Sequence, residues 1–579
     1  MENSEDEVNF KALFVPFTSI KAVCLIILLG LVVFFNGLFN AFVGDDLGQI
    51  VENPLVHSLG NISKFFTGST FYNGNAQTLI GNYYRPLFVT FFSGIYSFFG
   101  PNYLFFHLFQ ILLHIGNAIL VFLLFKLFLK RPIAFVLSLI FLVHPINSET
   151  ALYISDTQEV LFFFFGMLYL LLANSFQNQK TFITANIFLF LSLLSKETGV
   201  LFLFITNTYV FFLQKKHFVN ALVSGVSVFG IYLLMRLHAI GILSRPSNSS
   251  IAQFPLFQRL LNVPSMFFYY LKTFVLPIDL ASSYQWVYKQ IDFNHFIFPL
   301  FIGLLFLGVV GYFGFYIRKH KSKNFIPYIF FCVWFFVGMG IHMQIIPLDA
   351  TVAEGWFYFP MVGLLGMIGI ITQTYFKFLN KFLVIILVSI ILFLLSIRTF
   401  IRTFDWRNEL TIATHDLKVS KDAWGLENEL SYAYFKNGRF EEARVHAQKS
   451  VQLHPFITNY INLGAAYFSL KDFPKAKQAF MQSLKYGDLY QTYENLGFLS
   501  LSYGDPIENI DFIKNVALKK HPQDGKLWFY LSVLEYNFGD KEVAKNAIGK
   551  AYLYDQSMQI IGTYNAIMNN KPVKIGSDK

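Results

Sequence analysis

Long, almost uncharged apolar runs recur through the first two thirds of the chain, and they limit its fold more than any other feature. Most are long enough to cross about 30 Å of hydrocarbon as a helix. Only 14% of the residues are charged, against roughly a quarter in an ordinary soluble domain. We therefore expect an all-α, polytopic membrane helix bundle over residues 1–402. Eleven crossings are predicted, at about 21–39, 103–126, 132–146, 160–177, 182–195, 198–214, 218–236, 294–317, 326–344, 357–375 and 382–399.

Basic residues cluster between these runs, and their positions predict the orientation of the helices. The clusters are Lys126 with Lys130 and Arg131, Lys215 with Lys216, and the stretch from Arg318 to Lys323. Because Lys and Arg collect in cytoplasmic loops, all three should face the cytoplasm. The N-terminus is then cytoplasmic. The odd number of crossings places the C-terminal part on the other side, in a periplasm, the cell exterior or the lumen of the endoplasmic reticulum.

Two shorter apolar stretches, 86–99 and 263–277, are not counted among the eleven predicted crossings. Counting either as a crossing would move a basic cluster to the wrong side of the membrane, and the second stretch also carries Lys272. We expect both to be interfacial or re-entrant helices packed beside a polar cleft.

The net charge and the cysteines exclude two classes of function. A formal net charge of +10 fits the basic cytoplasmic loops of a membrane protein, so we expect contact with membrane lipids and no nucleic-acid partner. Cys24 and Cys332 both lie in apolar runs, which offers neither a disulfide framework nor the spacing of metal ligands.

After residue 402 the chain changes to amphipathic helices at a fixed spacing. Equivalent leucines follow one another by 33, 33 and 35 residues, at Leu430, Leu463, Leu496 and Leu531. This is close to the period of about 34 residues of tetratricopeptide repeats. The sequence predicts four such repeats over 424–558, with a linker at 403–423 and a tail at 559–579. The concave face of stacked repeats binds an extended peptide or another protein; alternatively, the repeats are a rigid spacer.

Polar and ionisable residues gather on the side of the membrane domain that we expect to face away from the cytoplasm. They are Asp45-Asp46, Tyr83-Tyr84-Arg85-Pro86, the stretch from His144 to Glu149, Asp156, Lys196-Glu197 and Ala353-Glu354-Gly355-Trp356. Charged groups at membrane depth are costly, so a one-sided collection favours a polar cavity. The alternative is that each group is a solvated loop end.

Several of these motifs occur in a recognisable order along nearly the whole chain. They are Phe42 to Asp46, Tyr84 to Leu87, His107 with His114, Val143 to Glu149, Ser195 to Gly199, Val352 to Glu354 with Tyr358 to Pro360, and Asp405-Trp406-Arg407. In this arrangement the chain resembles the transmembrane and tetratricopeptide-repeat-containing protein O-mannosyltransferases, a branch of the GT-C glycosyltransferases. It departs from the family pattern at Gly44, where the family usually has His, and at Gly355, where it has Arg.

The resemblance implies an inverting transferase with a lipid-linked sugar donor, a polyprenyl- or dolichyl-phosphate sugar. An acceptor hydroxyl attacks the anomeric carbon and displaces the lipid phosphate. This chemistry requires a base near the acceptor and cations near the leaving group.

Asp45 and Asp46 are the candidate catalytic residues. They follow the first crossing by about six residues, and two adjacent like charges allow one pKa to rise towards a useful value. We predict that Asp45 is the base and Asp46 its orienting partner, although the reverse assignment also fits the sequence. The alternative is that the two acids have no catalytic role and cap a helix that begins at Leu47.

Two cations are candidates for binding the donor phosphate. Arg85 lies between two aromatic residues and Pro86 at a membrane boundary; the alternative is an interfacial Arg whose guanidinium reaches the headgroups. Lys196 interrupts an apolar stretch, and the alternative is that it forms a self-neutralising pair with Glu197.

The remaining polar residues are expected to line the substrate cavity. They are Tyr84, His144, Glu149, Glu197 and Glu354. The spacing of His144 and Glu149 is loose for metal ligation, so we predict no metal ligand, while a requirement for a divalent metal stays open.

Taken together, the sequence predicts a membrane glycosyltransferase. It would transfer a hexose, with mannose favoured, from a polyprenyl-phosphate donor to Ser or Thr of a protein outside the cytoplasm, with the repeats binding the acceptor or a partner. Two alternatives are a transferase acting on a cell-surface glycan or lipid, and a non-catalytic membrane-anchored scaffold.

Overall fold

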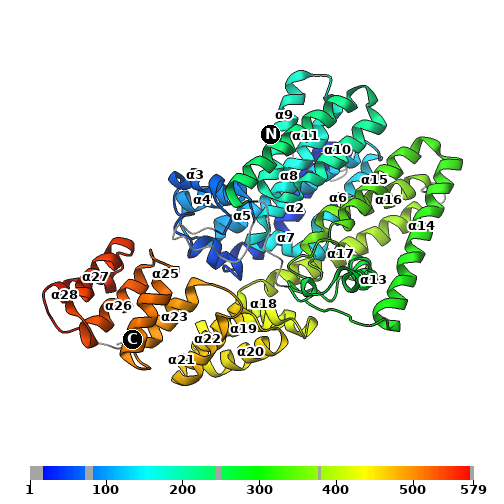
Figure 1. Ribbon diagram of the computed structural model, residues 1–579. Coiled ribbons are helices and arrows are strands. Elements are labelled where there is room, and N and C mark those ends of the chain that lie inside the picture. The colour runs from blue at the N-terminus through cyan, green and yellow to red at the C-terminus, as the bar shows by residue number, and fades with distance from the viewer. Residues whose placement is uncertain (1–16, 72–82, 242–248, 376–379, 574–579) are drawn as a thin grey trace, which may run out of the picture. The chain divides into compact units, whose positions relative to one another are not determined.

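A computed structural model describes residues 17–71, 83–241, 249–375 and 380–573. Throughout these residues the regular structure is helical, and the only strand-like pairing is an isolated bridge between Tyr284 and Val352. The expected all-α class is therefore confirmed. The described residues divide into a membrane unit, which runs from residue 17 to 70 and from 83 to 421, and a repeat unit, which begins at residue 422 (Figure 1).

The membrane unit is a bundle of helices joined by short helical turns. Its main helices are α2 (Ser19–Phe34), α3 (Ile62–Thr67), α4 (Pro86–Phe99), α5 (Tyr103–Phe125), α6 (Arg131–Val143), α7 (Ser148–Leu152), α8 (Thr157–Leu172), α9 (Gln179–Ser195), α10 (Val200–Leu213), α11 (Phe218–Ile240), α12 (Leu256–Leu260), α13 (Val263–Val275), α14 (Phe298–His320), α15 (Phe325–Gly340), α16 (Tyr358–Tyr375), α17 (Lys381–Asp405) and α18 (Glu409–Val419).

In the described residues, eight helical segments are long and apolar enough to cross a membrane, and a bent pair makes a ninth. The bent pair is α6 with residues 145–152, which meet at 52° where Pro145 interrupts the helix. The eleven expected crossings differ from this number at α9 and α10, which are apolar but only 17 and 14 residues long. The sidedness of the helices stays a prediction.

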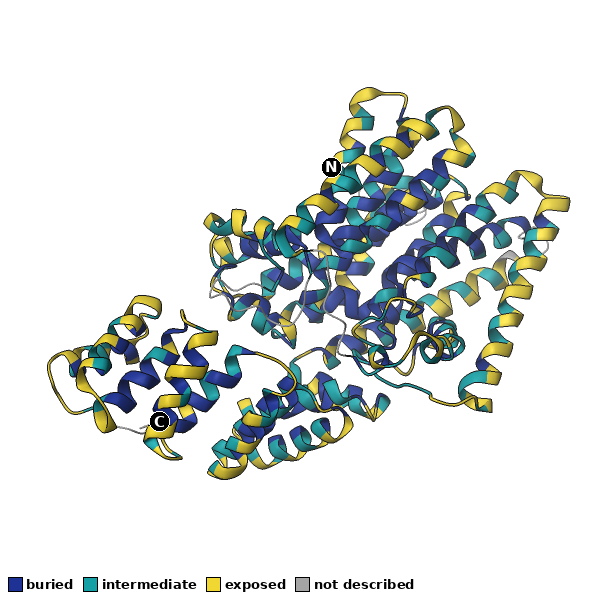
Figure 2. Ribbon diagram, viewed as in Figure 1, coloured by how far each residue is buried: buried dark blue, intermediate teal, exposed yellow. Residues whose placement is uncertain are grey.

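The two short apolar stretches that were not counted as crossings are both helical. They form α4, with 14 residues, and α13, with 13 residues. Figure 2 shows that α14 and α17 are largely exposed, whereas α16 is mostly buried. Long apolar helices with exposed surfaces are expected where lipid replaces water as the solvent.

Polar side chains inside the bundle join its helices. His114 of α5 interacts through Nδ1 with the Tyr358 hydroxyl of α16 at 2.9 Å and through Nε2 with the Leu142 carbonyl of α6 at 2.9 Å. The Asn117 amide donates to the same Tyr358 hydroxyl at 3.1 Å. All three side chains are buried, so these bonds satisfy polar groups that water does not reach. His114 therefore has a structural role here, because it joins α5 to α6 and α16.

The repeat unit consists of antiparallel helix pairs. Its helices are α19 (Trp424–Lys436), α20 (Phe440–Leu453), α21 (Ile457–Ser469), α22 (Phe473–Ser483), α23 (Tyr490–Ser500), α24 (Pro506–Phe512), α25 (Leu518–Lys520), α26 (Gly525–Phe538), α27 (Lys541–Tyr554) and α28 (Met558–Met568). The four in-phase leucines are buried, as the repeat pattern predicts. A side chain at Gly464 would meet the Phe480 ring at 2.5 Å, so this glycine lets paired helices approach closely. Helices α18 and α28 lie largely within the segments expected to be a linker and a tail.

Candidate active site

The two adjacent acids lie in a turn between α2 and the rest of the bundle, and they have different surroundings. Asp46 is fully buried. Its Oδ2 accepts from the Val43 N–H at 3.0 Å, and its Oδ1 accepts from the Ser155 N–H at 2.7 Å and the Ser155 hydroxyl at 2.6 Å. Burial raises the pKa of the Asp46 carboxyl to about 7, against the effect of these hydrogen bonds. Asp46 thus fastens the turn to the segment before α8.

Asp45, in contrast, has an exposed side chain. Its backbone N–H donates to the Tyr153 hydroxyl at 3.0 Å, while its carboxyl makes no hydrogen bond to the described residues. Removal from bulk water by the surrounding protein nevertheless raises the pKa of this carboxyl. The geometry favours Asp45 over Asp46 as the group that meets a substrate.

Arg85 lies at the start of α4, where its guanidinium is enclosed by polar and aromatic groups. Its Nε donates to Glu197 Oε2 at 2.9 Å, and its Nη1 donates to the Gln158 amide oxygen. The guanidinium also lies 4.2 Å from the centre of the Tyr83 ring, and the Tyr83 hydroxyl donates to Asp349. Since Arg85 is buried, the alternative of an Arg that extends to the headgroups is wrong.

Asp349 connects this group of residues to the acidic turn. Burial raises the pKa of the Asp349 carboxyl, and the negative charge of nearby Asp45 raises it further. Asp45 and Arg85 therefore border one polar region, with Tyr83 and Asp349 between them.

Lys196, between α9 and α10, forms an ion pair with Glu159 of α8, and both side chains are buried. Glu197 is paired with Arg85 instead. The alternative that Lys196 and Glu197 neutralise each other is therefore wrong. Asp156 interacts electrostatically with both Lys196 and Arg85, which places the two predicted phosphate-binding cations around one carboxylate.

Two of the predicted cavity residues support the backbone. The buried Tyr84 hydroxyl donates to the Phe66 carbonyl at 3.0 Å. The ring of His144 accepts from the Ile146 N–H through Nδ1 at 3.2 Å, so Nε2 carries the proton that bonds the Phe274 carbonyl at 2.9 Å. Neither side chain is placed by these contacts to meet a substrate.

Glu149 and Glu354 hold the segment that precedes α16. Glu149 Oε2 accepts from the Gly355 N–H at 2.8 Å, and Glu354 Oε1 accepts from the Ala281 N–H at 2.7 Å. A Cβ at Gly355 would lie 2.6 Å from Asp156 Oδ2, closer than a Cβ packs against another heavy atom. A side chain at this position would therefore require the Asp156 carboxylate to move.

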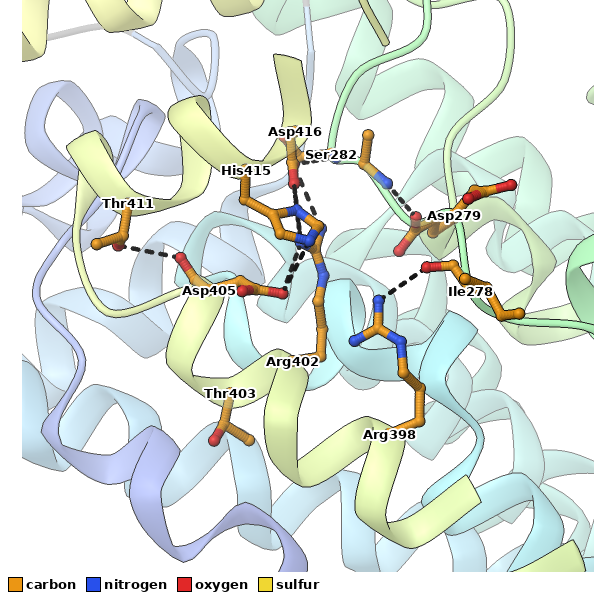
Figure 3. A network of polar contacts seen from close by, with 12 residues as sticks. Ile278, Asp279, Ser282, Arg398, Arg402, Thr403, Asp405, Thr411, His415 and Asp416 are labelled. Atoms are coloured by element: carbon orange, nitrogen blue, oxygen red, sulfur yellow. Dashed lines mark hydrogen bonds and ion pairs between the residues drawn. The ribbon is translucent and has the colours of Figure 1, made fainter. Parts of the chain in front are cut away.

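An ionic network that the sequence did not predict surrounds Arg402 (Figure 3). Arg402 also interacts electrostatically with Glu354. The buried guanidinium of Arg402 bonds both carboxylate oxygens of Asp416, through Nη1 at 2.8 Å and Nη2 at 3.3 Å. Nη1 also lies 3.2 Å from Asp405 Oδ2 and 2.9 Å from His415 Nδ1. Arg402 stands just beyond the last apolar run, and an ionisable residue at that depth was the available signal.

The same network reaches both the Glu354 segment and the acidic turn. Asp416 Oδ2 accepts from the Ser282 N–H at 2.6 Å, next to the Ala281 N–H that Glu354 holds. On its other side, Arg402 lies 5.6 Å from the Trp406 ring. Trp406 stacks on Tyr153, whose hydroxyl bonds the Asp45 backbone. Helices α17 and α18 therefore position both sides of the candidate site.

His342 is a second residue that sequence reasoning missed. It is buried, stacks on Trp356 with ring centres 5.1 Å apart, and interacts electrostatically with Lys196. Burial lowers the pKa of its imidazole to about 3, so the ring is neutral at pH 7. A histidine inside a predicted crossing was the signal. Among the described residues no cluster of three or more His, Cys, Asp or Glu side chains has the geometry of a metal site.

The fold and the site define a helical membrane protein with a cluster of buried carboxylates and cations, joined to a helical repeat unit. A tetratricopeptide repeat model matches residues 457–486, which form α21 and α22. The chain is 22% identical to human protein O-mannosyl-transferase TMTC3 over 524 residues, which cover 80% of this chain and 55% of the relative.

Two further relatives carry the same description. Protein O-mannosyl-transferase F38B6.6 of Caenorhabditis elegans is 22% identical over 75% of this chain and 63% of its own length. Human protein O-mannosyl-transferase TMTC1 is 34% identical over 129 residues, or 22% of this chain and 15% of its own length. These similarities confirm the resemblance that the motifs predicted. The chain spans about half the length of the TMTC3 relatives that it matches.

Proposed function

We propose that the protein transfers mannose from a polyprenyl-phosphate donor to a Ser or Thr hydroxyl of a protein, on the side of the membrane away from the cytoplasm. The observation that carries the proposal is the division between the two acids. Asp46 is saturated with hydrogen bonds, whereas the Asp45 carboxyl is accessible and has no hydrogen-bond partner among the described residues. The names of the relatives support the same reaction class.

In the proposed step the acceptor oxygen attacks the anomeric carbon from the face opposite the phosphate. The new C–O bond forms as the bond between the anomeric carbon and the phosphate oxygen breaks. Asp45 takes the hydroxyl proton, and the lipid phosphate leaves with the bonding electrons. Raising the pKa of Asp45 makes it a better proton acceptor once it is ionised. Asp46 and Tyr153 act as positioning residues, because they hold the backbone on either side of the base.

Arg85 is the better placed of the two proposed phosphate ligands. Its Nε and Nη1 are bonded to Glu197 and Gln158, but Nη2 makes no hydrogen bond to the described residues. A guanidinium has five N–H donors, so a phosphate oxygen can bind Nη2 without breaking either bond. Lys196 is buried against Glu159, and we propose that it contributes through its charge more than through direct contact.

The test is single-turnover transfer by the purified full chain in lipid nanodiscs. The donors are labelled mannosyl and glucosyl polyprenyl phosphates, and the acceptors are Ser/Thr-rich peptides. We expect release of polyprenyl phosphate together with mannosylated peptide. Consumption of the donor only when a glycan or lipid acceptor is supplied would shift the proposal to the alternative acceptor class. No transfer from any donor by well-folded protein would support the scaffold alternative.

A further inference from the structure

The loop that follows α15, residues 341–354, borders the candidate active site along much of its length. Near its start, the buried His342 interacts electrostatically with Lys196. Farther along, Asp349 interacts electrostatically with Asp45. The loop therefore extends from the region of the proposed phosphate-binding cations to the region of the proposed base.

A glutamine inside this loop holds its backbone in one arrangement. Gln344 is fully buried and has a φ of 57°, in the left-handed region that few residues other than glycine adopt. Its Nε2 donates to the Ala350 carbonyl at 2.7 Å and to the Thr351 carbonyl at 3.1 Å. Its Oε1 accepts from the Leu348 N–H at 3.0 Å. One side chain thus fixes the backbone on both sides of Asp349, and these bonds hold the residue in its costly conformation.

Neighbouring segments hold the same loop from outside. The Ser249 hydroxyl donates to the Leu348 carbonyl at 2.5 Å. The Thr351 N–H donates to the Tyr284 carbonyl at 2.8 Å, and the Thr351 hydroxyl donates to the Trp286 carbonyl at 2.7 Å. The acid that lies between these anchors therefore stands on a fixed backbone, although its residue is exposed.

The Asp349 carboxyl has one occupied and one open acceptor. Its Oδ2 accepts from the Tyr83 hydroxyl, while its Oδ1 makes no hydrogen bond to the residues that the structure describes. The Tyr83 ring lies over the Arg85 guanidinium. A single aromatic side chain thus connects this carboxyl to the better placed of the two proposed phosphate ligands.

The proposed reaction requires the donor sugar to lie in the same region. The anomeric carbon is bonded to the phosphate oxygen, and the base acts on the acceptor hydroxyl at the opposite face of that carbon. With the phosphate at Arg85 and the base at Asp45, the sugar ring lies between the two residues. Asp349 interacts with groups at both ends, with Asp45 electrostatically and with Arg85 through Tyr83.

We propose that Asp349 binds a hydroxyl group of the donor sugar and thereby contributes to the choice of sugar. The inference rests on the proposed function. An ionised carboxyl only accepts hydrogen bonds and a sugar hydroxyl donates one, so Oδ1 can bind a hydroxyl while Oδ2 stays bonded to Tyr83. Hexoses that differ in configuration at one carbon present that hydroxyl in different directions. A carboxyl on a fixed backbone can distinguish between them, because a misdirected hydroxyl loses a strong, charge-assisted bond.

Removing the hydroxyl and the carboxyl in turn tests this bond. Transfer is measured for the full chain in lipid nanodiscs with polyprenyl-phosphate mannose and with analogues that each lack one sugar hydroxyl. In the wild type, loss of the hydroxyl that Asp349 binds should lower kcat/KM by about ten- to a hundredfold. In Asp349→Ala, the same analogue should be used nearly as well as the complete donor. A penalty of equal size in both proteins for every analogue would overturn the assignment.

Tyr83→Phe is the matched control, because it removes the hydroxyl that bonds Asp349 but keeps the carboxyl and the ring over Arg85. This variant should retain the penalty for the missing sugar hydroxyl, whatever its overall rate. Loss of the penalty in Tyr83→Phe, with the penalty kept in Asp349→Ala, would assign sugar recognition to Tyr83 and contradict the proposal.

A binding experiment separates this proposal from the proposed function. The affinities of the wild type and Asp349→Ala are measured for polyprenyl-phosphate mannose and for polyprenyl phosphate, which has no sugar. The wild type should prefer the mannosylated lipid, and Asp349→Ala should lose this preference while binding polyprenyl phosphate as before. An equal preference in both proteins, or a large loss of affinity for polyprenyl phosphate in Asp349→Ala, would overturn the role of Asp349. Absence of transfer by the wild type would overturn the proposed function and leave this binding result to decide the role of Asp349.

Discussion

Charges in the repeat unit and in the membrane unit are arranged in different ways. Several ion pairs of the repeat unit are local and lie at the surface, such as Arg439 with Glu442, which are three residues apart. In the membrane unit, the buried Arg402–Asp416 pair joins separate helices. Exposed pairs are screened by water and contribute little, whereas a buried charge that loses its partner is strongly destabilising. We therefore expect exposed pairs to add little to the stability of the repeats, and the buried pair to favour one arrangement of segments in the membrane unit.

The largest expected effect is on the rate of transfer. It comes from changing Asp45, the proposed base, which makes no hydrogen bond through its carboxyl to the described residues. Asp45→Asn should lower single-turnover transfer by about 10² to 10⁴, because it removes the proton acceptor. Its melting temperature should stay near that of the wild type, since the carboxyl has no hydrogen-bond partner among the described residues. Near-normal transfer by this variant would contradict the assignment of the base.

A change at Arg402, by contrast, should lower the stability of the protein, because this buried guanidinium is paired with Asp416. Arg402→Met leaves Asp416 buried without its partner and should cost about 3 to 5 kcal/mol of stability. Thermal unfolding of the detergent-solubilised protein measures this loss. The double variant Arg402→Met/Asp416→Leu removes both charges and should recover part of the stability. Equal loss in the single and double variants would show that the pair is not the cause.

The pH dependence of stability sharpens the distinction between the two adjacent acids. Burial raises the pKa of Asp46 from 3.8 to about 7, so the folded protein favours the protonated carboxyl. Its stabilising contribution is present below pH 3.8 and is lost as the pH rises through about 7. The stability of the wild type relative to Asp46→Asn should therefore fall across this range. A difference that does not vary with pH would contradict the raised pKa.

The smallest effect is expected in the repeat unit. Arg439→Ala removes an exposed pair with Glu442, and we expect no measurable change in melting temperature or in transfer. Glu442→Ala should give the same result. A clear loss of transfer with unchanged stability would instead show that this part of the repeat surface meets a substrate or partner.

The comparison also shows which parts of the structure can be predicted from sequence. The repeats were predictable because each repeat packs only against its neighbours. A spacing of 33 to 35 residues in the sequence therefore indicates which residues are buried between repeats, such as Leu430 and Leu463. Most membrane helices were predictable because apolar length is a local property. The shortness of α9 and α10 was not, since the surrounding helices determine where the chain turns.

The candidate site was predictable only in part. The sequence placed Asp45, Arg85 and Lys196 in one region, but it did not predict their partners. Asp416 bonds the Ser282 backbone across 134 residues, and no local pattern carries that information. The carboxylate partner of Lys196 is Glu159, although Glu197 is adjacent in the sequence. Partner choice inside a bundle depends on tertiary packing.

The backbone contact at Ser282 has a consequence for how this region can vary during evolution. Asp416 binds the N–H of residue 282 and not its side chain, which is partly exposed. Many residue types supply the same N–H, so substitutions there should be tolerated, whereas proline lacks the donor and should be excluded. In a set of related sequences, position 282 would look almost unconstrained while Asp416 and Arg402 vary together.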